Sequence, residues 1–252
     1  MNDTERKNLT QRDAPLEMSP EAFRRAGHQL VEDLAAFLEE LPSGKVTTAP
    51  TVEEIKSLLG AAPLPPHGMD PDTLLHEVTD QMKQHSLFNG HPRFWGYITS
   101  SAAPIGALAD FLASTMNQNV GAWQLSPLAS EIETQTIRWI AEFVGYPVDC
   151  GGLMVSGGNM ANFVGFLAGR KSRIPWDLRK EGMQHRTERV SVYCSEATHT
   201  WIEKAAELFG LGTDAIRWIP CDANERLRVE ELEKQVRTDK EEGTLPPVSY
   251  TH

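Results

Sequence analysis

A glycine-rich junction at residues 156–159 is the part of this sequence best suited to bind an anion. The apolar run "LMV" predicts a strand over 152–156, and "SGGN" leads from it into a predicted helix over 159–171. A helix that begins directly after glycines exposes unpaired backbone N–H groups at the positive end of its dipole, where phosphate binds well. Asn159 can cap this helix or donate to a ligand. The alternative is a plain strand-to-helix turn, because neither the P-loop pattern nor the pattern GxGxxG is present.

A histidine follows the next predicted strand, which covers residues 190–194. His199 lies just beyond it, near the start of a predicted helix over 198–209. Ligands of parallel sheets bind beyond the carboxyl ends of the strands, so we expect His199 and the 156–159 junction at one sheet edge. His199 is therefore a candidate catalytic and cofactor-binding residue, with a hydrogen-bonded structural histidine as the alternative. Glu203 follows at a helical spacing, but no second histidine joins the pair, and we expect no metal.

Glu196 offers an alternative function, a dinucleotide-binding oxidoreductase. An acid at the end of a second strand can hold the ribose of a dinucleotide. Glu196, however, lies 38 residues after Gly158, where about 20 is typical, and the third glycine of the fingerprint is absent. These departures favour a smaller phosphorylated cofactor over nicotinamide.

An aromatic segment, "HPRFWGYITSS" at residues 91–101, is the third candidate for chemistry. Binding pockets favour aromatic side chains with a few polar groups, which makes His91, Trp95 and Tyr97 candidate pocket residues. The alternative is an aromatic cluster that anchors the N-terminal region to the core.

Two kinds of elements must position these residues. Ser19-Pro20 and Asp70-Pro71 predict helix starts, and a proline-rich connection with a short helix at 52–59 joins the two helices. The first helix is apolar without an obvious local partner, so we expect it to pack on another part of the fold or on another subunit.

Ser126-Pro127 begins a further helix that ends near Gly145. Beyond it, strands and helices alternate, which predicts an α/β fold with a mainly parallel sheet; its remaining predicted elements are strands at 216–220 and from 245, and a helix at 229–241.

Composition excludes several classes of protein. The 252 residues carry a formal net charge of −11, which argues against a nucleic-acid partner and against an anionic membrane surface. The 3 cysteines are widely spaced and form neither a disulfide framework nor a zinc-ligand set. We therefore expect reduced thiols in a cytoplasmic protein. We find neither an apolar signal core nor a run of about 18 apolar residues, so we expect no membrane span.

Taken together, four stretches resemble the pyridoxal-phosphate-dependent amino-acid decarboxylases of the aromatic-amino-acid and glutamate decarboxylase group. They are "HPRFWGYITSS", "SPLASEIETQTIRWIAEFVGYP", "GLMVSGGNMANFVGFLAGR" and "YCSEATHTWIEKAAELFGLG". The resemblance implies an aminotransferase-like α/β large domain over 91–252, preceded by a helical arm over 1–90 that packs on the partner subunit of a homodimer. It also implies pyridoxal 5'-phosphate as cofactor and decarboxylation of an L-amino acid, a small-molecule substrate that we expect to be aromatic.

The resemblance also assigns roles to individual residues. Gly157, Gly158 and Asn159 fall where the family holds the cofactor phosphate, and His199 falls where a histidine stacks on the pyridine ring. Tyr97 and Ser100 fall in the segment that lines the substrate pocket of aromatic-specific members.

The family's Schiff-base lysine and its pyridine-pairing aspartate have no counterpart in these residues. Lys171 stands at the far end of the predicted phosphate-loop helix, and Lys204 is five positions after His199. We therefore expect a chain truncated at its C-terminal side and inactive alone. Other interpretations are a decarboxylase or lyase acting on glutamate, a cysteine-derived acid or a phosphorylated sphingoid base, and a non-catalytic fragment or dimer partner.

Overall fold

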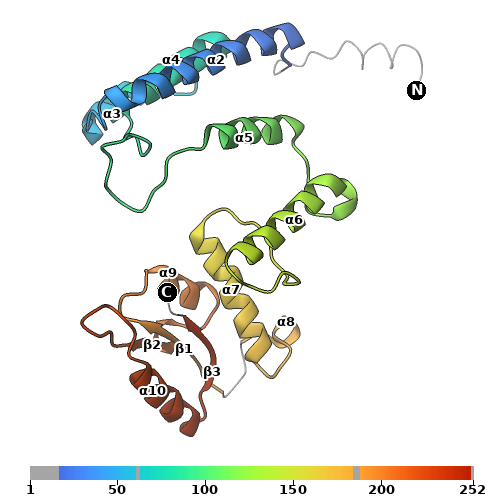
Figure 1. Cartoon of the computed structure of the whole chain (residues 1–252), viewed down its shortest axis with the longest axis vertical. Coiled ribbons are helices and arrows are strands. Elements are labelled where there is room, and N and C mark those ends of the chain that lie inside the picture. The colour runs from blue at the N-terminus through green and yellow to red at the C-terminus, as the bar shows by residue number, and fades with distance from the viewer. Residues whose placement is uncertain (1–16, 61–62, 184–187, 251–252) are drawn as a thin grey trace. The chain divides into compact units, whose positions relative to one another are not determined.

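The computed structural model describes residues 17–60, 63–183 and 188–250 (Figure 1). The chain divides into two compact units, Met1–Asn117 and Gln118–His252. The predicted division into an arm over 1–90 and a large domain over 91–252 stays a prediction. Each unit is described by itself.

Unit 1 is helical, and its helices begin where the sequence predicts. The Ser19 hydroxyl accepts a hydrogen bond from the Ala22 N–H, and the Asp70 carboxylate accepts one from the Thr73 N–H. Each donor–acceptor distance is 3.1 Å. Each cap is followed by a proline that needs no hydrogen-bond acceptor in the first turn. The helices are α2 (Pro20–Glu40), α3 (Val52–Leu59), α4 (Pro71–His85) and α5 (Pro104–Met116), with the short 3₁₀ helix η1 (Leu41–Ser43).

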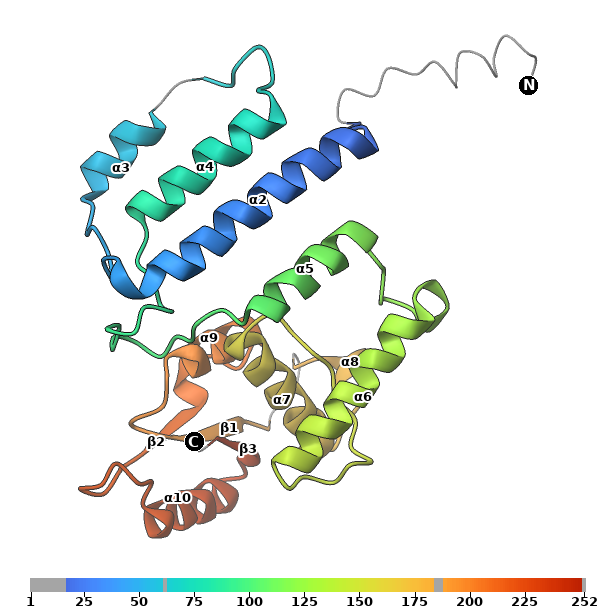
Figure 2. The ribbon, with the colours of Figure 1, turned by 45° about the horizontal axis from the view of Figure 1, so that its top comes forward.

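The first helix has a local partner, which the sequence alone did not reveal. α2 and α4 lie side by side (Figure 2), and the Arg25 guanidinium contacts the Asp72 carboxylate across them at 2.7 Å. Much of the apolar face of α2 is nevertheless exposed, including Phe23, Leu34 and Leu38. The packing on α4 therefore covers only part of that face.

Unit 2 contains a parallel sheet in the order β2-β1-β3, which confirms the predicted α/β class. Its strands are β1 (Val190–Ser195), β2 (Ile216–Ile219) and β3 (Leu245–Tyr250). The helices are α6 (Pro127–Phe143), α7 (Gly158–Arg173), α8 (Leu178–Glu181), α9 (Trp201–Leu208) and α10 (Val229–Glu241), with 3₁₀ helices η2 (Trp123–Leu125) and η3 (Thr213–Ala215).

The prediction of a strand at 152–156 was wrong. This segment has no regular secondary structure, and the side chains of Leu153 and Met154 are each 55% exposed. The Met154 N–H donates to the Glu133 side chain of α6 at 2.7 Å instead of to a neighbouring strand. An apolar run forms a strand only where a sheet edge accepts its backbone, which periodicity does not reveal.

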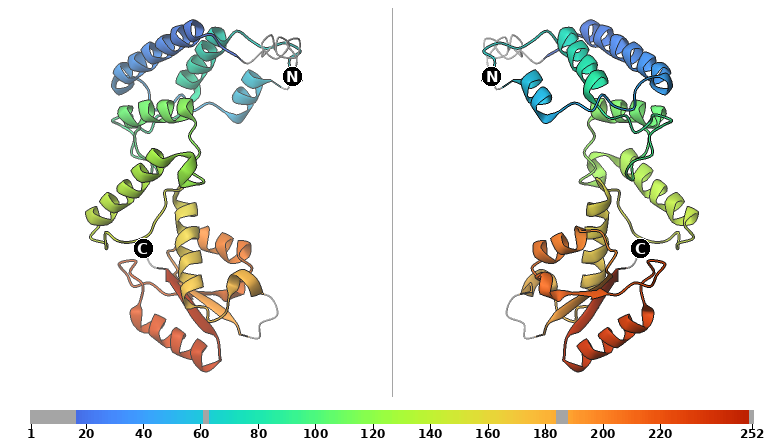
Figure 3. Two further views of the ribbon diagram at one scale, coloured as in Figure 1. Left: turned by 90° about the vertical axis from the view of Figure 1, so that its right-hand side faces the viewer. Right: turned by 90° about the vertical axis from the view of Figure 1, so that its left-hand side faces the viewer.

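The core of unit 2 lies on one face of β1. Strand alternation points Val192 and Cys194 toward α7 and α9, where they pack with Phe166 and Trp201. α9 and α10 lie on opposite sides of the strands (Figures 1 and 2), and α7 lies against β3 (Figure 3). The core therefore joins the helix after the glycine-rich junction to the helix after His199.

No helix in the described part of the chain combines the length and the apolar character that crossing a bilayer requires.

Candidate cofactor-binding site

The glycine-rich junction forms the start of α7. Gly157 is the N-cap, with φ +97° and ψ 163°, and no side chain caps the helix. The first helical turn closes with the Ala161 N–H donating to the Gly157 carbonyl at 3.1 Å. Within the described residues, the N–H groups of Gly158, Asn159 and Met160 have no such acceptor. These donors remain available at the positive end of a 16-residue helix.

The same junction is open to a ligand. A methyl group built on Gly157 or Gly158 would meet no heavy atom within 4 Å. Asn159 is exposed at the second position of α7, so its side-chain amide can add a donor. Backbone and amide donors at a helix start suit the charge and size of a phosphate, so these residues fit the phosphate group of the predicted cofactor.

A carboxylate on α6 supports the segment that leads into the junction. The half-buried Glu133 accepts the Met154 N–H. A methyl group on Gly152 would lie 2.9 Å from Ile137, so the backbone also passes close to α6 at this point. No sequence pattern marks Glu133, because its role depends on a contact across 21 residues.

His199 lies in the turn between β1 and α9 and not on the helix, because α9 begins at Trp201. The imidazole is exposed, and its Nδ1 accepts a long hydrogen bond of 3.3 Å from the Trp201 N–H. The turn itself is closed by a hydrogen bond between the buried hydroxyl groups of Ser195 and Thr198. No motif in the sequence marks these two hydroxyl residues as a pair.

Aromatic packing ties the two parts of the site together. Phe163 and Phe166 of α7 each place a ring centroid 6.3 Å from that of Trp201, directly after the His199 turn. Arg170 lies over the Phe209 ring at 5.5 Å and donates to the Phe209 carbonyl. α7 and α9 are thereby held against each other.

Burial dominates the electrostatics of the groups beneath the site. It raises the pKa of the Cys194 thiol to about 11, against the effect of the Thr198 hydroxyl. Burial likewise lowers the pKa of the Arg170 guanidinium. Cys194 is fully buried and stays a neutral thiol, so it is a packing residue and not a nucleophile.

The predicted substrate residues belong to unit 1. Tyr97 is 86% exposed, with a left-handed backbone at φ +58°, and Ser100 is also exposed. Because Gly157, Gly158, Asn159 and His199 belong to unit 2, their assembly with Tyr97 and Ser100 stays a prediction. His91 is a structural residue, since Nε2 contacts the Gly44 carbonyl at 3.2 Å and Nδ1 accepts the Arg93 N–H at 3.0 Å.

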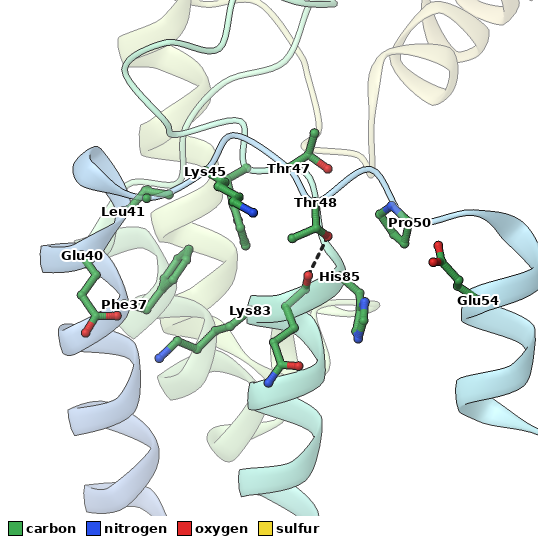
Figure 4. A pocket seen from close by; sticks show the side chains of 13 residues that line it. Phe37, Glu40, Leu41, Lys45, Thr47, Thr48, Pro50, Glu54, Lys83 and His85 are labelled. Carbon is green, nitrogen blue, oxygen red and sulfur yellow. Dashed lines mark hydrogen bonds between the residues drawn. The ribbon is translucent and has the colours of Figure 1, made fainter.

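A pocket of about 610 Å³ lies within unit 1 (Figure 4). Phe37 and Leu41 line one side, Pro50 and His85 the other, and the Thr48 hydroxyl donates to the Gln84 carbonyl at 2.7 Å. None of the predicted site residues lines it. It therefore shares no residue with the candidate cofactor site.

Comparison with known sequences decides the family. Residues 57–251 match the profile of the pyridoxal-dependent decarboxylase conserved domain. The chain belongs to the pyridoxal-dependent decarboxylase family. This family consists of carboxy-lyases, and membership leaves the dinucleotide-binding alternative without support.

Relatives within the family differ in substrate. The chain is 30% identical over 231 residues to an aromatic-L-amino-acid decarboxylase of Bacillus atrophaeus, covering 92% of this chain and 46% of the relative. It is 26% identical over 234 residues to an L-2,4-diaminobutyrate decarboxylase of Acinetobacter baumannii. This match covers 88% of this chain and 45% of the relative. The chain thus spans about half the length of the relatives it matches.

Solved structures agree on the fold. Mouse CSAD superposes with a TM-score of 0.78 at 25% identity, covering 90% of this chain and 48% of that one. Oryza sativa TDC, solved with PLP and tryptamine, gives a TM-score of 0.81 at 24% identity. The match covers 94% of this chain and 49% of that structure's chain. The fold of this chain is therefore that of pyridoxal-phosphate decarboxylases.

Proposed function

We propose that this chain contributes the phosphate and ring contacts of a pyridoxal-phosphate-dependent decarboxylase that acts on an L-amino acid with an aromatic side chain. The open N-terminus of α7 is the observation that carries the proposal. Its unpaired N–H groups are joined through Phe163, Phe166 and Trp201 to the turn that bears His199. Family membership makes pyridoxal phosphate the anion that suits this arrangement.

Each residue has a distinct role in the proposal. The backbone N–H groups of Gly158 and Asn159 and the side-chain amide of Asn159 hold the phosphate, and His199 stacks on the pyridine ring. Gly157, whose own N–H donates to the Val155 carbonyl at 3.0 Å, allows the chain to turn into α7 beside the phosphate. When bound, pyridoxal phosphate supplies a protonated ring that accepts the electron pair left as carbon dioxide departs. An imidazole whose Nδ1 is already engaged keeps a fixed orientation and offers the ring a flat face.

The choice of an aromatic substrate rests on Tyr97 and Ser100 and on the aromatic-L-amino-acid decarboxylase among the relatives. An exposed tyrosine ring gives an aromatic side chain a stacking surface. Diaminobutyrate and acidic amino acids are the competing substrates, because relatives named for them also match. A panel of these amino acids, titrated against the chain in the presence of pyridoxal 5'-phosphate, discriminates between them by their affinities.

We also propose that these 252 residues alone do not turn over an amino acid. Lys171 is 13 residues along α7 from Gly158, which corresponds to about 20 Å along the helix axis. Lys204 is exposed on α9. Neither is placed to hold a cofactor whose phosphate sits at Gly158. Mixing the chain with cofactor and an aromatic amino acid should release no amine, and turnover near that of a longer relative would contradict this.

We propose a homodimer built through the helical arm. The exposed apolar side chains of α2, including Phe23, Leu34 and Leu38, support this because monomers rarely expose so continuous an apolar surface. A second copy of the chain is the partner that the family resemblance implies.

Titration of the chain with pyridoxal 5'-phosphate and with pyridoxal tests the cofactor role. Both carry the same aldehyde, so pyridoxal controls for reaction with surface lysines. We expect pyridoxal phosphate to quench tryptophan fluorescence saturably and to bind at least about tenfold more tightly, since phosphate contacts at a helix N-terminus are charge-assisted. Equal affinities would contradict the proposal.

A further inference from the structure

We propose that Thr198 and Ser195 are positioning residues for His199. Their paired hydroxyl groups hold the turn between β1 and α9 in the shape that presents the imidazole in one tautomer and one orientation. The importance of that orientation for the cofactor rests on the proposed function, whereas the orientation itself does not.

The hydroxyl pair lies at the base of the turn. Ser195 ends β1 and is 5% exposed, and Thr198 is 9% exposed. Their side-chain oxygens are 3.1 Å apart, and the Thr198 N–H donates to the Ser195 carbonyl at 2.9 Å. The Glu196 N–H donates to the Ile219 carbonyl of β2 at 3.0 Å. The turn is thus closed on itself and fastened to the neighbouring strand.

His199 directly follows the hydrogen-bonded pair of Ser195 and Thr198, and its imidazole forms a hydrogen bond with the chain that follows it. Its Nδ1 accepts the N–H of Trp201, a residue that is 1% exposed in the core. A nitrogen that accepts a hydrogen bond carries no proton, so the neutral imidazole bears its proton on Nε2. The ring is therefore oriented by its hydrogen bond to the Trp201 backbone, and the backbone that precedes it is fixed by the hydroxyl pair.

A buried hydroxyl group that loses its partner must move or admit water. If Thr198 became valine, the β-branched shape would remain, but the Ser195 hydroxyl would lose its hydrogen bond. Relaxation of the turn would then displace the residue that follows, which is His199. We expect the bond between Nδ1 and Trp201 to weaken first, because at 3.3 Å it is already long.

Four variants separate positioning from stability: Thr198→Val, Ser195→Ala, the two combined, and Thr198→Ser as the matched control that keeps the hydroxyl. The first readout is the ¹⁵N chemical shifts of the His199 ring, which report the tautomer. The second is affinity for pyridoxal 5'-phosphate, compared with that for inorganic phosphate, which needs only the loop at α7. The third is the free energy of unfolding.

We expect the wild type and Thr198→Ser to show the Nε2–H tautomer, and each single loss of a hydroxyl to give mixed tautomers. Affinity for pyridoxal phosphate should fall about fivefold to tenfold in those variants, the loss corresponding to one hydrogen bond, with affinity for inorganic phosphate unchanged. The combined variant should recover stability, since no unpaired hydroxyl remains, but not the tautomer.

Recovery of the Nε2–H tautomer together with stability in the combined variant would show that the hydroxyl pair is only structural and would overturn the inference. A single tautomer in all variants would also overturn it. If the wild type binds no pyridoxal phosphate, the proposed function fails, and the ring shifts alone decide the inference. If Thr198→Val does not fold, Ser195→Ala and the combined variant give the same comparison.

Discussion

Gly157 adopts a backbone conformation that residues with a side chain avoid. Its φ of +97° with ψ of 163° lies in a region populated almost only by glycine, whereas Gly158 already belongs to α7. The two adjacent glycines therefore do different work. The first allows the sharp entry into the helix, and the second leaves room for a ligand.

Alanine at each glycine tests this difference. Gly157→Ala should lower the free energy of unfolding by about 1–3 kcal/mol, because a side chain is strained at this φ. Gly158→Ala is the matched control and should leave stability within about 1 kcal/mol, since its new methyl group meets nothing within 4 Å. Urea unfolding measures both, and equal losses would contradict the assignment.

Glu133 is the residue on which the approach to the glycine junction depends. Its carboxylate is half-buried and accepts the Met154 N–H. Glu133→Ala should cost about 1–2 kcal/mol and weaken phosphate binding, with Glu133→Gln milder because an amide oxygen still accepts. The exposed Glu142 of the same helix, changed to alanine, is the control. If both alanine variants behave alike in urea unfolding and phosphate titration, this support is absent.

Among the elements, β1 is the central strand, and its two faces serve different purposes. Val192 and Cys194 face the core with α7 and α9. On the other face, the Tyr193 hydroxyl donates to Asp239 of α10 at 2.6 Å, and Arg217 of β2 contacts the same carboxylate at 3.1 Å. This buried network fastens α10 to the sheet.

The network predicts acid sensitivity. Burial acts to raise the pKa of Asp239, but hydrogen bonds from Tyr193 and Arg217 outweigh it and hold the pKa below its usual value. A carboxyl whose folded-state pKa is lowered stabilises the protein above its unfolded pKa of about 3.9, and that stability is lost as pH falls through the folded value. We expect the free energy of unfolding to drop below about pH 4 for this reason.

Asp239→Asn supplies the measurement. The variant should be less stable at pH 7 by about 3 kcal/mol, because it leaves Arg217 without its charged partner. It should also show a smaller change in stability between pH 5 and pH 3 than the wild type. Glu233→Gln, at an exposed position of α10, should keep the wild-type pH profile. An unchanged profile in Asp239→Asn would rule out this role.

Element boundaries were predictable wherever the signal was local. Ser19 and Asp70 cap their helices as expected, because a capping side chain and the N–H groups it accepts lie within three residues of each other. The prediction of a strand at 152–156 was wrong, because strand pairing depends on residues that are distant in the sequence. The glycine-rich start of α7 could be located from the sequence. Glu133 and the pair of Ser195 and Thr198 could not, because their roles depend on three-dimensional contacts that carry no sequence pattern.

For the molecule as a whole, the apolar surface of α2 predicts self-association. Sedimentation velocity should show a dimer whose fraction rises with concentration, because burial of apolar side chains drives association. Leu34→Glu, at an exposed apolar position of α2, should weaken it, whereas Glu39→Gln on the same helix should not. A chain that stays monomeric at every concentration would exclude the arm as a dimer contact.

We propose above all that the N-terminus of α7 holds the phosphate of pyridoxal phosphate. Amide NMR of the 252-residue chain during addition of pyridoxal 5'-phosphate tests it most directly. We predict that the amide protons of Gly158, Asn159 and Met160 shift downfield together as their N–H groups gain an anionic acceptor, and that inorganic phosphate shifts the same amides. Saturable binding that leaves these amides unmoved and shifts another region would contradict the account.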